Sequence, residues 1–599
     1  MVMFDHREEG VVTSRVMHMR EKLAAVGCLI RKRGGVCSSF FSWNTFCLIV
    51  IGLSVLTLST KGLTNSGTFS LQGDMPRYIM NGVFFHDSIQ DFPFSDPIQY
   101  VKEYYVRYPA LSIGHHPLLP SLAEVPFFFL FGISVFSAKA TTLAFVFLGI
   151  FAWFELVKTL YNSHIAFLSS LLFLTSPMIV EYSRVMMSEI PALALIIVAT
   201  YWFFRYCKNE RPHEAFGYVL SFVLACYAKQ MVIFMFPIFF VYLGVTKGIR
   251  FLMKQETIMS CLAIIILLIP LAVMTWTLSP ANVSMVTQNI VKPLAPQAEE
   301  VEKGKEGIFQ SVGSYIHWKL ISTEWLFYPT VLWKKQVSVV PLVLSVGAVV
   351  MMVWRREKRS LYFFLWIMAM YGMVTFMGMR IPRLGIYWIP PVCLFAALSL
   401  EAVNSRVWRV VVALLLIGSV GYQFGVGYAS EPEYAKGYEE AASYVVNHSK
   451  GASVLYSANV DTGYFIFFVR KFDPEGRLVV LRADKMLATS RLDRIVEEKI
   501  STPGELYDVL RDFGTCYVVL EEGHYTSPAL NLLAEEVQSE QFIRTHTISI
   551  DSNNRRLQGV NLGIFEYRGC GPPNKNALVN FNIPLANLSI RLKFSDVID

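Results

Sequence analysis

Residues 216–245 read FGYVLSFVLACYAKQMVIFMFPIFFVYLGV, two apolar runs that meet at Lys229. Basic residues flank this stretch on both sides, in RYCKNER at 205–211 and in KGIRFLMK at 247–254. Lys and Arg gather on the cytoplasmic side of membrane proteins, so both ends are expected inside and the stretch must cross the bilayer twice. We therefore expect a helical hairpin with Lys229 at its outer turn. The alternative is a single helix with a lysine buried in lipid, which is energetically costly.

The composition agrees with a membrane protein. Hydrophobic residues make up 54% of the chain and charged residues only 17%, whereas soluble proteins carry about 25% charged residues. The excess apolar content is expected to lie in lipid rather than in one very large core. The net charge of +7 bears on membrane orientation, and we expect no nucleic-acid partner.

Hydrophobic runs on either side of the hairpin complete the expected topology. A basic cluster at 31–33 precedes the first run and places the N-terminus in the cytoplasm. The runs predict an α-helical polytopic membrane protein with roughly eleven transmembrane helices. These helices are expected at 43–60, 139–178 (two helices, broken at 161–164), 190–204, 216–245 (two), 257–278, 337–354, 361–377, 386–400 and 410–424.

The run at 118–133 is a weaker candidate for a span. It is short, contains prolines and is interrupted by Glu124. It could span, but we expect it to lie at the outer interface, because nearly every strong basic cluster then falls inside.

The C-terminal part has a different pattern. Runs at 453–458, 464–470, 477–483 and 515–522 predict strands, and 438–451 and 501–514 predict helices. Alternating strands and helices are typical of a soluble α/β domain. The expected organisation is a cytoplasmic segment at 1–42, a transmembrane domain at 43–428 with outer loops at 61–137 and 279–336, an extracytoplasmic α/β domain at 429–568 and an irregular tail at 569–599. Cys516 and Cys570 could form a disulfide in this region.

Polar residues from separate outer segments form the candidate site. The polar stretch 68–116 supplies several of them, including an acid at its start and two histidines at its end. The charged candidates are Asp74, Arg77, His115, His116, Arg184, Glu189, Lys229, Arg380 and Arg383. The cations could hold a phosphate, and a carboxylate among them could act as a base. A lipid-phosphate substrate fits this pattern, with its tail in the bilayer and its head among the loops.

Structural roles are the alternative for the same residues. Lys229 could be a lysine that extends to the membrane surface, and Glu189 could favour the start of the helix that it opens. Arg380 and Arg383 could anchor a helix end, and the two histidines could hydrogen-bond at the interface.

Several of these segments resemble motifs of the GT-C glycosyltransferases. GDMPRY at 73–78 resembles their D-E-A-R-Y pattern, and HHPL at 115–118 resembles their H-P-P-L segment. Further resemblance lies in SRVMMSEIPALALIIVATYWFF at 183–204, AKQMVIFMFP at 228–237 and RIPRLGIYWIPP at 380–391. The most similar groups are the protein O-mannosyltransferases, the lipid A aminoarabinose transferases and the rhizobial lipid-A-core sugar transferases. The resemblance covers about residues 43–400.

The resemblance implies a fold of GT-C type and an inverting transfer of a sugar. The donor would be a polyprenyl-phosphate sugar, and the acceptor a hydroxyl of an envelope lipid, glycan or protein on the outer face of the cytoplasmic membrane. Asp74 matches the catalytic Asp of the family, which acts as base on the acceptor hydroxyl. Lys229, Arg380 and His116 are candidates to bind the phosphate, and Glu189 to bind acceptor or sugar. The remaining expected substrate-binding residues are Arg77, Tyr78, His115, Arg184 and Arg383.

The chain departs from the family pattern at two places. Met75 stands where the family often has a second acid, so a metal bridge on an adjacent acidic pair is in doubt, and we predict no required metal or cofactor. The H-H-P-L sequence leaves open which of His115 and His116 matches the family histidine.

Two other functions compete with glycosyl transfer. A transporter or lipid flippase would place its binding residues near the midplane, often within repeated halves. Here the charges lie at one expected face and no repeat is visible, which favours the enzyme. A sensor or assembly protein that binds a partner through the outer α/β domain would leave the charges of the loops unexplained.

Overall fold

A computed structural model describes residues 42–67, 74–93, 95–279, 323–376, 380–460, 462–490, 496–583 and 588–598. The chain forms two compact units, Met1–Leu53 and Ser54–Asp599. The first unit contributes only the start of α2 (Trp43–Ser59) to the described residues. The basic cluster at 31–33 and most of the predicted outer loop 279–336 lie outside them.

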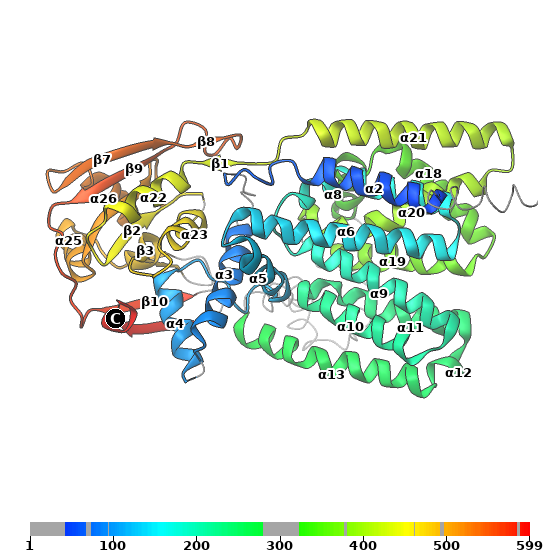
Figure 1. The fold of residues 1–599 in the computed structure, drawn as a ribbon, viewed down its shortest axis with the longest axis horizontal. Helices are drawn as coiled ribbons and strands as arrows, with labels where there is room; N and C mark the ends of the chain where they lie inside the picture. The colour runs from blue at the N-terminus through cyan, green and yellow to red at the C-terminus, as the bar shows by residue number, and fades with distance from the viewer. Residues whose placement is uncertain are drawn as a thin grey trace, which may run out of the picture. The chain divides into compact units, whose positions relative to one another are not determined.

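Helices are present at every predicted span (Figure 1). After α2 and the helices of segment 61–137, the chain forms α6 (Val135–Leu160), α7 (Ser163–Thr175), α8 (Pro177–Ser183), α9 (Glu189–Asn209), α10 (Pro212–Ala228), η1 (Gln230–Phe234), α11 (Met235–Lys247), α12 (Ile249–Leu252) and α13 (Gln255–Leu278). It resumes with η2 (Thr323–Leu326), α17 (Phe327–Val331), η3 (Leu332–Gln336), α18 (Val339–Trp354), α19 (Lys358–Phe376), η4 (Pro382–Trp388), α20 (Ile389–Ala402) and α21 (Arg406–Ala429).

Length and composition single out the membrane-spanning candidates. Among the described residues, six helical segments are long and apolar enough to cross a membrane, or seven if the bent pair α7–α8 is one span. Three shorter apolar helices, α2, α5 (Leu119–Phe131) and α18, add to these. The chain is a multi-pass membrane protein, and the count of roughly eleven spans remains a prediction.

The break expected at Lys229 is present. Helix α10 ends at Ala228, and Lys229 has an extended backbone with φ −159° and ψ 117°. Its N–H still bonds to the carbonyl of Ala225, after which η1 and α11 begin. One continuous helix through Lys229 is therefore excluded. The ammonium group lies at the end of two helices rather than in the middle of one.

The described part of segment 61–137 contains three packed helices. It contains α3 (Met75–Asp91), α4 (Pro97–Arg107) and α5, and α3 packs along α5. A Cβ on Gly82 of α3 would lie 2.1 Å from a carboxylate oxygen of Glu124 on α5, so the two helices approach closely there. Ser121 donates a hydrogen bond to the Tyr78 carbonyl at 2.9 Å. The helix that begins after Asp74 is thus fixed along its length.

The C-terminal region confirms the expected mixture of strands and helices. Its main sheet has five strands in the order β3 (Val479–Arg482), β2 (Ser453–Ser457), β6 (Thr515–Glu521), β9 (Asn561–Tyr567) and β7 (Phe542–Ser549). Strand β2 runs parallel to β3 and β6, and β9 is antiparallel to its neighbours. The other elements are β1 (Ala435–Lys436), α22 (Tyr438–His448), α23 (Gly463–Phe472), α24 (Ala483–Met486), β4 (Ala488–Ser490), β5 (Val496–Glu498), α25 (Pro503–Asp512), α26 (Pro528–Glu536) and β8 (Asp551–Ser552).

Two predictions for this region were wrong. Residues 464–470 form part of helix α23, not a strand. Every residue from 463 to 470 is buried, so an uninterrupted apolar run could not distinguish a buried strand from a buried helix. The tail expected to be irregular contains the antiparallel hairpin β10 (Leu578–Ile583) and β11 (Leu588–Lys593), followed by α27 (Ser595–Ile598).

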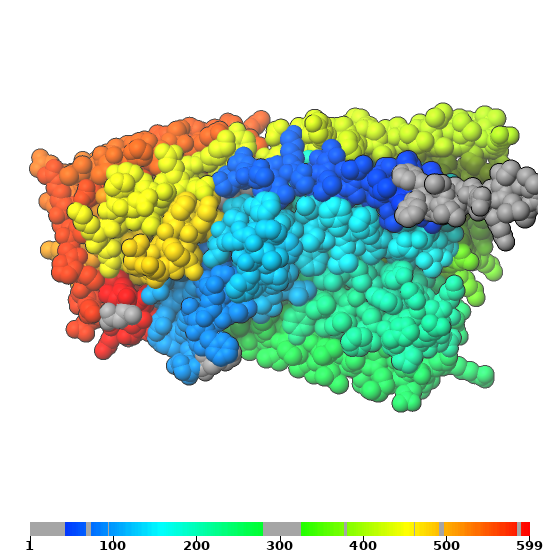
Figure 2. Space-filling view, in the orientation of Figure 1, coloured from blue at the N-terminus to red at the C-terminus, as the bar shows by residue number. Residues whose placement is uncertain are grey.

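The C-terminal region packs on the helices of segment 61–137. Helix α23 contacts α3, and α27 contacts α4. In the space-filling view the yellow and red surface of the C-terminal region lies directly against blue surface from the N-terminal part of the chain (Figure 2). Arg470 of α23 donates to Asp87 of α3 at 2.8 Å, and Tyr104 of α4 donates to the same carboxylate oxygen at 2.6 Å. All three side chains are buried. The same helix that carries Asp74 at its start is therefore held near its end by the C-terminal region.

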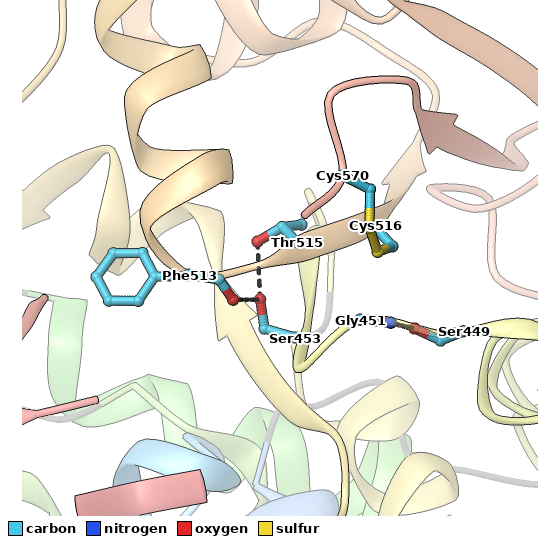
Figure 3. The surroundings of a disulfide bond; sticks show 7 residues. All are labelled: Ser449, Gly451, Ser453, Phe513, Thr515, Cys516 and Cys570. Carbon is cyan, nitrogen blue, oxygen red and sulfur yellow. Dashed lines mark hydrogen bonds between the residues drawn. A yellow bond between two sulfur atoms is a disulfide. The ribbon is translucent and has the colours of Figure 1, made fainter. Parts of the chain in front are cut away.

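The disulfide between Cys516 and Cys570 is formed (Figure 3). It joins β6 to the segment after β9 and closes a loop across a sequence separation of 54 residues. Disulfides persist in oxidising compartments, so this bond supports the expectation that the C-terminal region is extracytoplasmic.

Candidate functional site

The site is built around Asp74, the residue directly before helix α3. Asp74 is the N-cap of α3, but its side chain makes no capping hydrogen bond. Instead, Arg383 Nη2 donates to Asp74 Oδ2 at 2.7 Å, and His116 Nε2 lies 3.6 Å from Asp74 Oδ1. The partial positive charge of a helix N-terminus also favours a carboxylate at this place. Three predicted site residues, distant in sequence, are therefore in contact.

A second acid lies on the other side of Arg383. Glu189, the first residue of α9, is fully buried, and Lys229 donates to its Oε1 atom. Arg383 Nε lies 3.5 Å from the same oxygen. The guanidinium group thus bridges Asp74 and Glu189, and the break between α10 and α11 brings in the second cation.

Aromatic rings line the cluster beside Asp74. The His116 ring lies 4.8 Å from the Tyr78 ring and 4.9 Å from the His115 ring, measured between centroids. His115 Nδ1 is 3.1 Å from Ser279 Oγ. Asn81 of α3 exchanges two hydrogen bonds with Ser112, which orients the chain just before the two histidines.

The surroundings set the charge state of these groups. Burial opposes ionisation of Asp74, but the charge of Arg383 and the hydrogen bond that it donates hold the pKa of this carboxyl below the usual range. Burial lowers the pKa of His116 to about 3 despite the nearby carboxylate, and burial also lowers the pKa of His115. Burial and the charge of Glu189 raise the pKa of Tyr78. Near neutral pH the site thus has an ionised Asp74 beside neutral histidines.

Three other predicted residues occupy different positions. Arg77 is half-buried, and its charge acts on Asp74 and both histidines. Arg380 is exposed, three residues before Arg383. Arg184 is not brought into the cluster: it is buried and donates to the carbonyls of Leu58, Gly427 and Ser430, where it ties together helix ends.

Sequence reasoning assigned no role to two residues near the cluster. Tyr387 is fully buried, its hydroxyl has no hydrogen-bond partner within the described residues, and Glu189 and Tyr78 act on it electrostatically. It lies within the RIPRLGIYWIPP segment, so that resemblance could have identified it. Gln336 bonds to both ends of the η4 turn that carries Arg383. No sequence signal distinguishes it.

The cluster has unused hydrogen-bonding capacity. In the part of the chain that the structure describes, Arg383 Nε and Nη1 and His116 Nε2 have no hydrogen-bond partner. An ionised carboxylate beside a guanidinium group can accept a proton while the N–H groups of the guanidinium hold an anion. The described residues contain no group of three or more His, Cys, Asp or Glu side chains that could hold a metal ion.

Comparison with known proteins adds evidence of a different kind. A family model described as dolichyl-phosphate-mannose-protein mannosyltransferase matches residues 115–276. This range includes His115, His116, Glu189 and Lys229 but not Asp74 or Arg383. No curated protein matches the chain.

Solved structures resemble most of the chain. ArnT from Cupriavidus metallidurans bound to undecaprenyl phosphate has a TM-score of 0.55 at 12% identity, over 89% of this chain and 100% of that one. The archaeal oligosaccharyltransferase AglB from Archaeoglobus fulgidus, in complex with an inhibitory peptide and a dolichol-phosphate, has a TM-score of 0.50 at 10% identity, over 80% and 69%. At such low identity these matches concern the fold. Together with the family model, they confirm the resemblance to the GT-C glycosyltransferases.

Proposed function

We propose that this protein transfers a sugar from a polyprenyl-phosphate donor to a hydroxyl group of an envelope acceptor at the outer face of the membrane. The observation that carries the proposal is the pairing of Asp74 with Arg383, in a chain with a GT-C fold. The similar structures bind undecaprenyl phosphate or dolichol-phosphate, which supports a polyprenyl-phosphate donor for this chain.

The reaction follows from the charges of the cluster. Asp74 accepts the proton of the acceptor hydroxyl through Oδ1, since Oδ2 is bonded to Arg383. The hydroxyl oxygen forms a bond to the anomeric carbon as the bond from that carbon to the phosphate oxygen breaks. Attack from the face opposite the phosphate inverts the anomeric configuration. The polyprenyl phosphate leaves with the bonding electron pair and an additional negative charge.

The leaving phosphate requires positive charge. Lys229, Arg380 and His116 are the predicted phosphate ligands, and Arg383 Nη1 has no hydrogen-bond partner among the described residues. Cations and hydrogen-bond donors placed where negative charge develops stabilise the transition state. Glu189 would balance Lys229 and Arg383 while the site is empty and contact the sugar or acceptor when it is occupied.

The proposed orientation follows the distribution of basic residues. The N-terminus is cytoplasmic, and the C-terminal region is outside the membrane, next to the site. Its contacts with α3 and α4, and its disulfide, support this arrangement. We expect the C-terminal region to help cover or choose the acceptor.

The test uses mass spectrometry of envelope glycolipids and glycoproteins from a deletion strain. Complementation with the wild-type gene should restore one sugar addition, and Asp74→Asn should not, because loss of a general base lowers the rate by about 10²–10⁴-fold. Asp91→Asn is the matched control, since Asp91 is an exposed carboxylate at the opposite end of α3. Full complementation by Asp74→Asn, with both variants present at equal levels in the membrane, would overturn the proposal.

A further inference from the structure

Gln336 is a fully buried amide within the helical membrane part. Its Nε2 donates to the carbonyl of Pro382 at 2.9 Å, and its Oε1 accepts from Trp388 Nε1 at 2.6 Å. These partners are the first and last residues of η4. Burial of a polar group is costly unless the group is hydrogen-bonded. Both polar atoms of the Gln336 amide are bonded, and their partners are the two ends of the same turn.

The amide also lies against the middle of that turn. A Cβ on Gly385 would be 2.6 Å from Gln336 Nε2, closer than real Cβ atoms approach other groups. A side chain at position 385 would therefore push the amide from its present position between the two partners. Gln336 comes from η3, 46 residues before Pro382, so the contact is tertiary rather than local.

The turn needs such support because of its geometry. It is a 3₁₀ helix of seven residues. Runs of 3₁₀ helix longer than three or four residues are uncommon, since their hydrogen bonds are poorly aligned. Arg383 is the second residue of this turn, so any change in the path of η4 moves the guanidinium between Asp74 and Glu189.

We propose that Gln336 is a positioning residue for the transfer reaction: it holds η4 so that Arg383 pairs with Asp74 and bridges to Glu189. This inference rests on the proposed function. Gln336 touches none of the expected reacting atoms, and it acts through the backbone of Pro382. Its loss should leave the substrates bound but misplace the cation that keeps Asp74 ionised.

The experiment compares Gln336→Leu with Gln423→Leu. Gln423 is a matched control: it is equally buried, donates to Ser338 at 2.8 Å and accepts from Thr175 at 2.9 Å, but neither partner belongs to η4. Both variants should lose stability. For Gln336→Leu alone, kcat should fall by about 10- to 100-fold, because a displacement of about 1 Å from a productive geometry can have such an effect. KM should change much less.

The pH profile separates positioning from general destabilisation. The charged and titratable groups that face Asp74 are Arg383, His116, Arg77, His115 and Tyr78. If Arg383 moves away, protonation of Asp74 becomes easier, and the acid limb of kcat should shift to higher pH. The acid limb of Gln423→Leu should coincide with that of the wild type. A Gln336→Leu profile and kcat equal to those of Gln423→Leu would overturn the inference while the proposed function stands.

A second variant protects the test against misfolding. Gly385→Ala leaves Gln336 in place but forces its amide away, and it should give the same shift of the acid limb. Wild-type behaviour of Gly385→Ala would also overturn the inference. Wild-type turnover by Asp74→Asn would instead overturn the proposed function, and with it the role of Gln336.

Discussion

Removal of Arg383 is the sharpest test of the electrostatics of this site. Its Nη2 atom donates a hydrogen bond to Asp74 Oδ2 at 2.7 Å. Its Nε atom lies 3.5 Å from Glu189 Oε1. Both side chains of the Asp74–Arg383 pair are 19% exposed, so solvent screens them only partly. Arg383→Ala should therefore change the ionisation of Asp74 as well as the binding of the leaving phosphate.

The size of the shift follows from the bond that is lost. A hydrogen bond to a charged group contributes about 1.5–3 kcal/mol, and one pKa unit corresponds to about 1.36 kcal/mol. The pKa of Asp74 should therefore rise by about one to two units in Arg383→Ala. Since the base must be deprotonated, the acid limb of the transfer rate should move to higher pH by the same amount.

The same pair links folding stability to pH. The pKa of Asp74 is lowered in the folded protein, so the pair contributes stability above the unfolded-state pKa of this group. That stability is lost as the pH falls through the folded-state value. The acid side of the thermal-stability profile should thus be flatter in Arg383→Ala than in the wild type.

The assay is transfer from a polyprenyl-phosphate sugar by purified protein in lipid nanodiscs, measured from about pH 2.5 to pH 8, a range that begins below the ordinary pKa of an Asp carboxyl group. Arg383→Lys is the companion variant. It keeps the charge but loses the forked geometry, so its acid limb should lie between those of the wild type and Arg383→Ala. An unchanged acid limb in Arg383→Ala would refute the reasoning, because Asp74 would then owe its low pKa to other groups.

Three further predictions concern the fold around the site. Arg470→Gln leaves the buried Asp87 without its cation and should lower the free energy of unfolding, measured in detergent, by about 3–5 kcal/mol. The control is Lys436→Gln, which breaks the exposed ion pair with Asp551. An equal loss of stability in the two variants would contradict a stabilising role of the buried ion pair. Cys516→Ser should lower stability by about 2–4 kcal/mol under oxidising conditions, and a reductant should abolish the difference from the wild type; a difference that persists in reductant would show that the bond is not its cause. A cysteine in place of Gln230 should react with a membrane-impermeant thiol reagent from outside the cell, and reaction only from inside would reverse the proposed topology of the α10–α11 hairpin.

The sequence predicted the helices of the membrane part well because lipid restricts the choice. A segment in hydrocarbon must satisfy its own backbone hydrogen bonds, so long apolar runs form helices. The break at Lys229 followed from the same physics, since a lysine in the middle of a span is costly. The C-terminal region has no such restriction, because strands and helices can both be buried in a soluble domain. The apolar run at 464–470 was therefore compatible with a strand, although it forms α23.

The candidate site was predicted in part. Charge and position in the chain selected Asp74, His116, Glu189, Lys229 and Arg383, which the structure brings together. The same criteria selected Arg184 equally, yet its guanidinium binds backbone carbonyls at the ends of neighbouring helices. Two arginines with the same local signal thus differ in what the fold places beside them: backbone carbonyls for Arg184, and two carboxylates for Arg383.

Sequence alone determined that Asp74 lies in a polar segment next to membrane-spanning helices, because hydropathy and charge are properties of each stretch by itself. Tertiary structure decided that Asp74 pairs with Arg383, 309 residues later, and that Gln336 bonds to both ends of the η4 turn that carries Arg383. Such contacts depend on how separate helices pack against one another, and the composition of a single segment does not reveal its neighbours in the fold. The sequence thus identified which residues can carry the chemistry, and the fold determined which of their charges lie together.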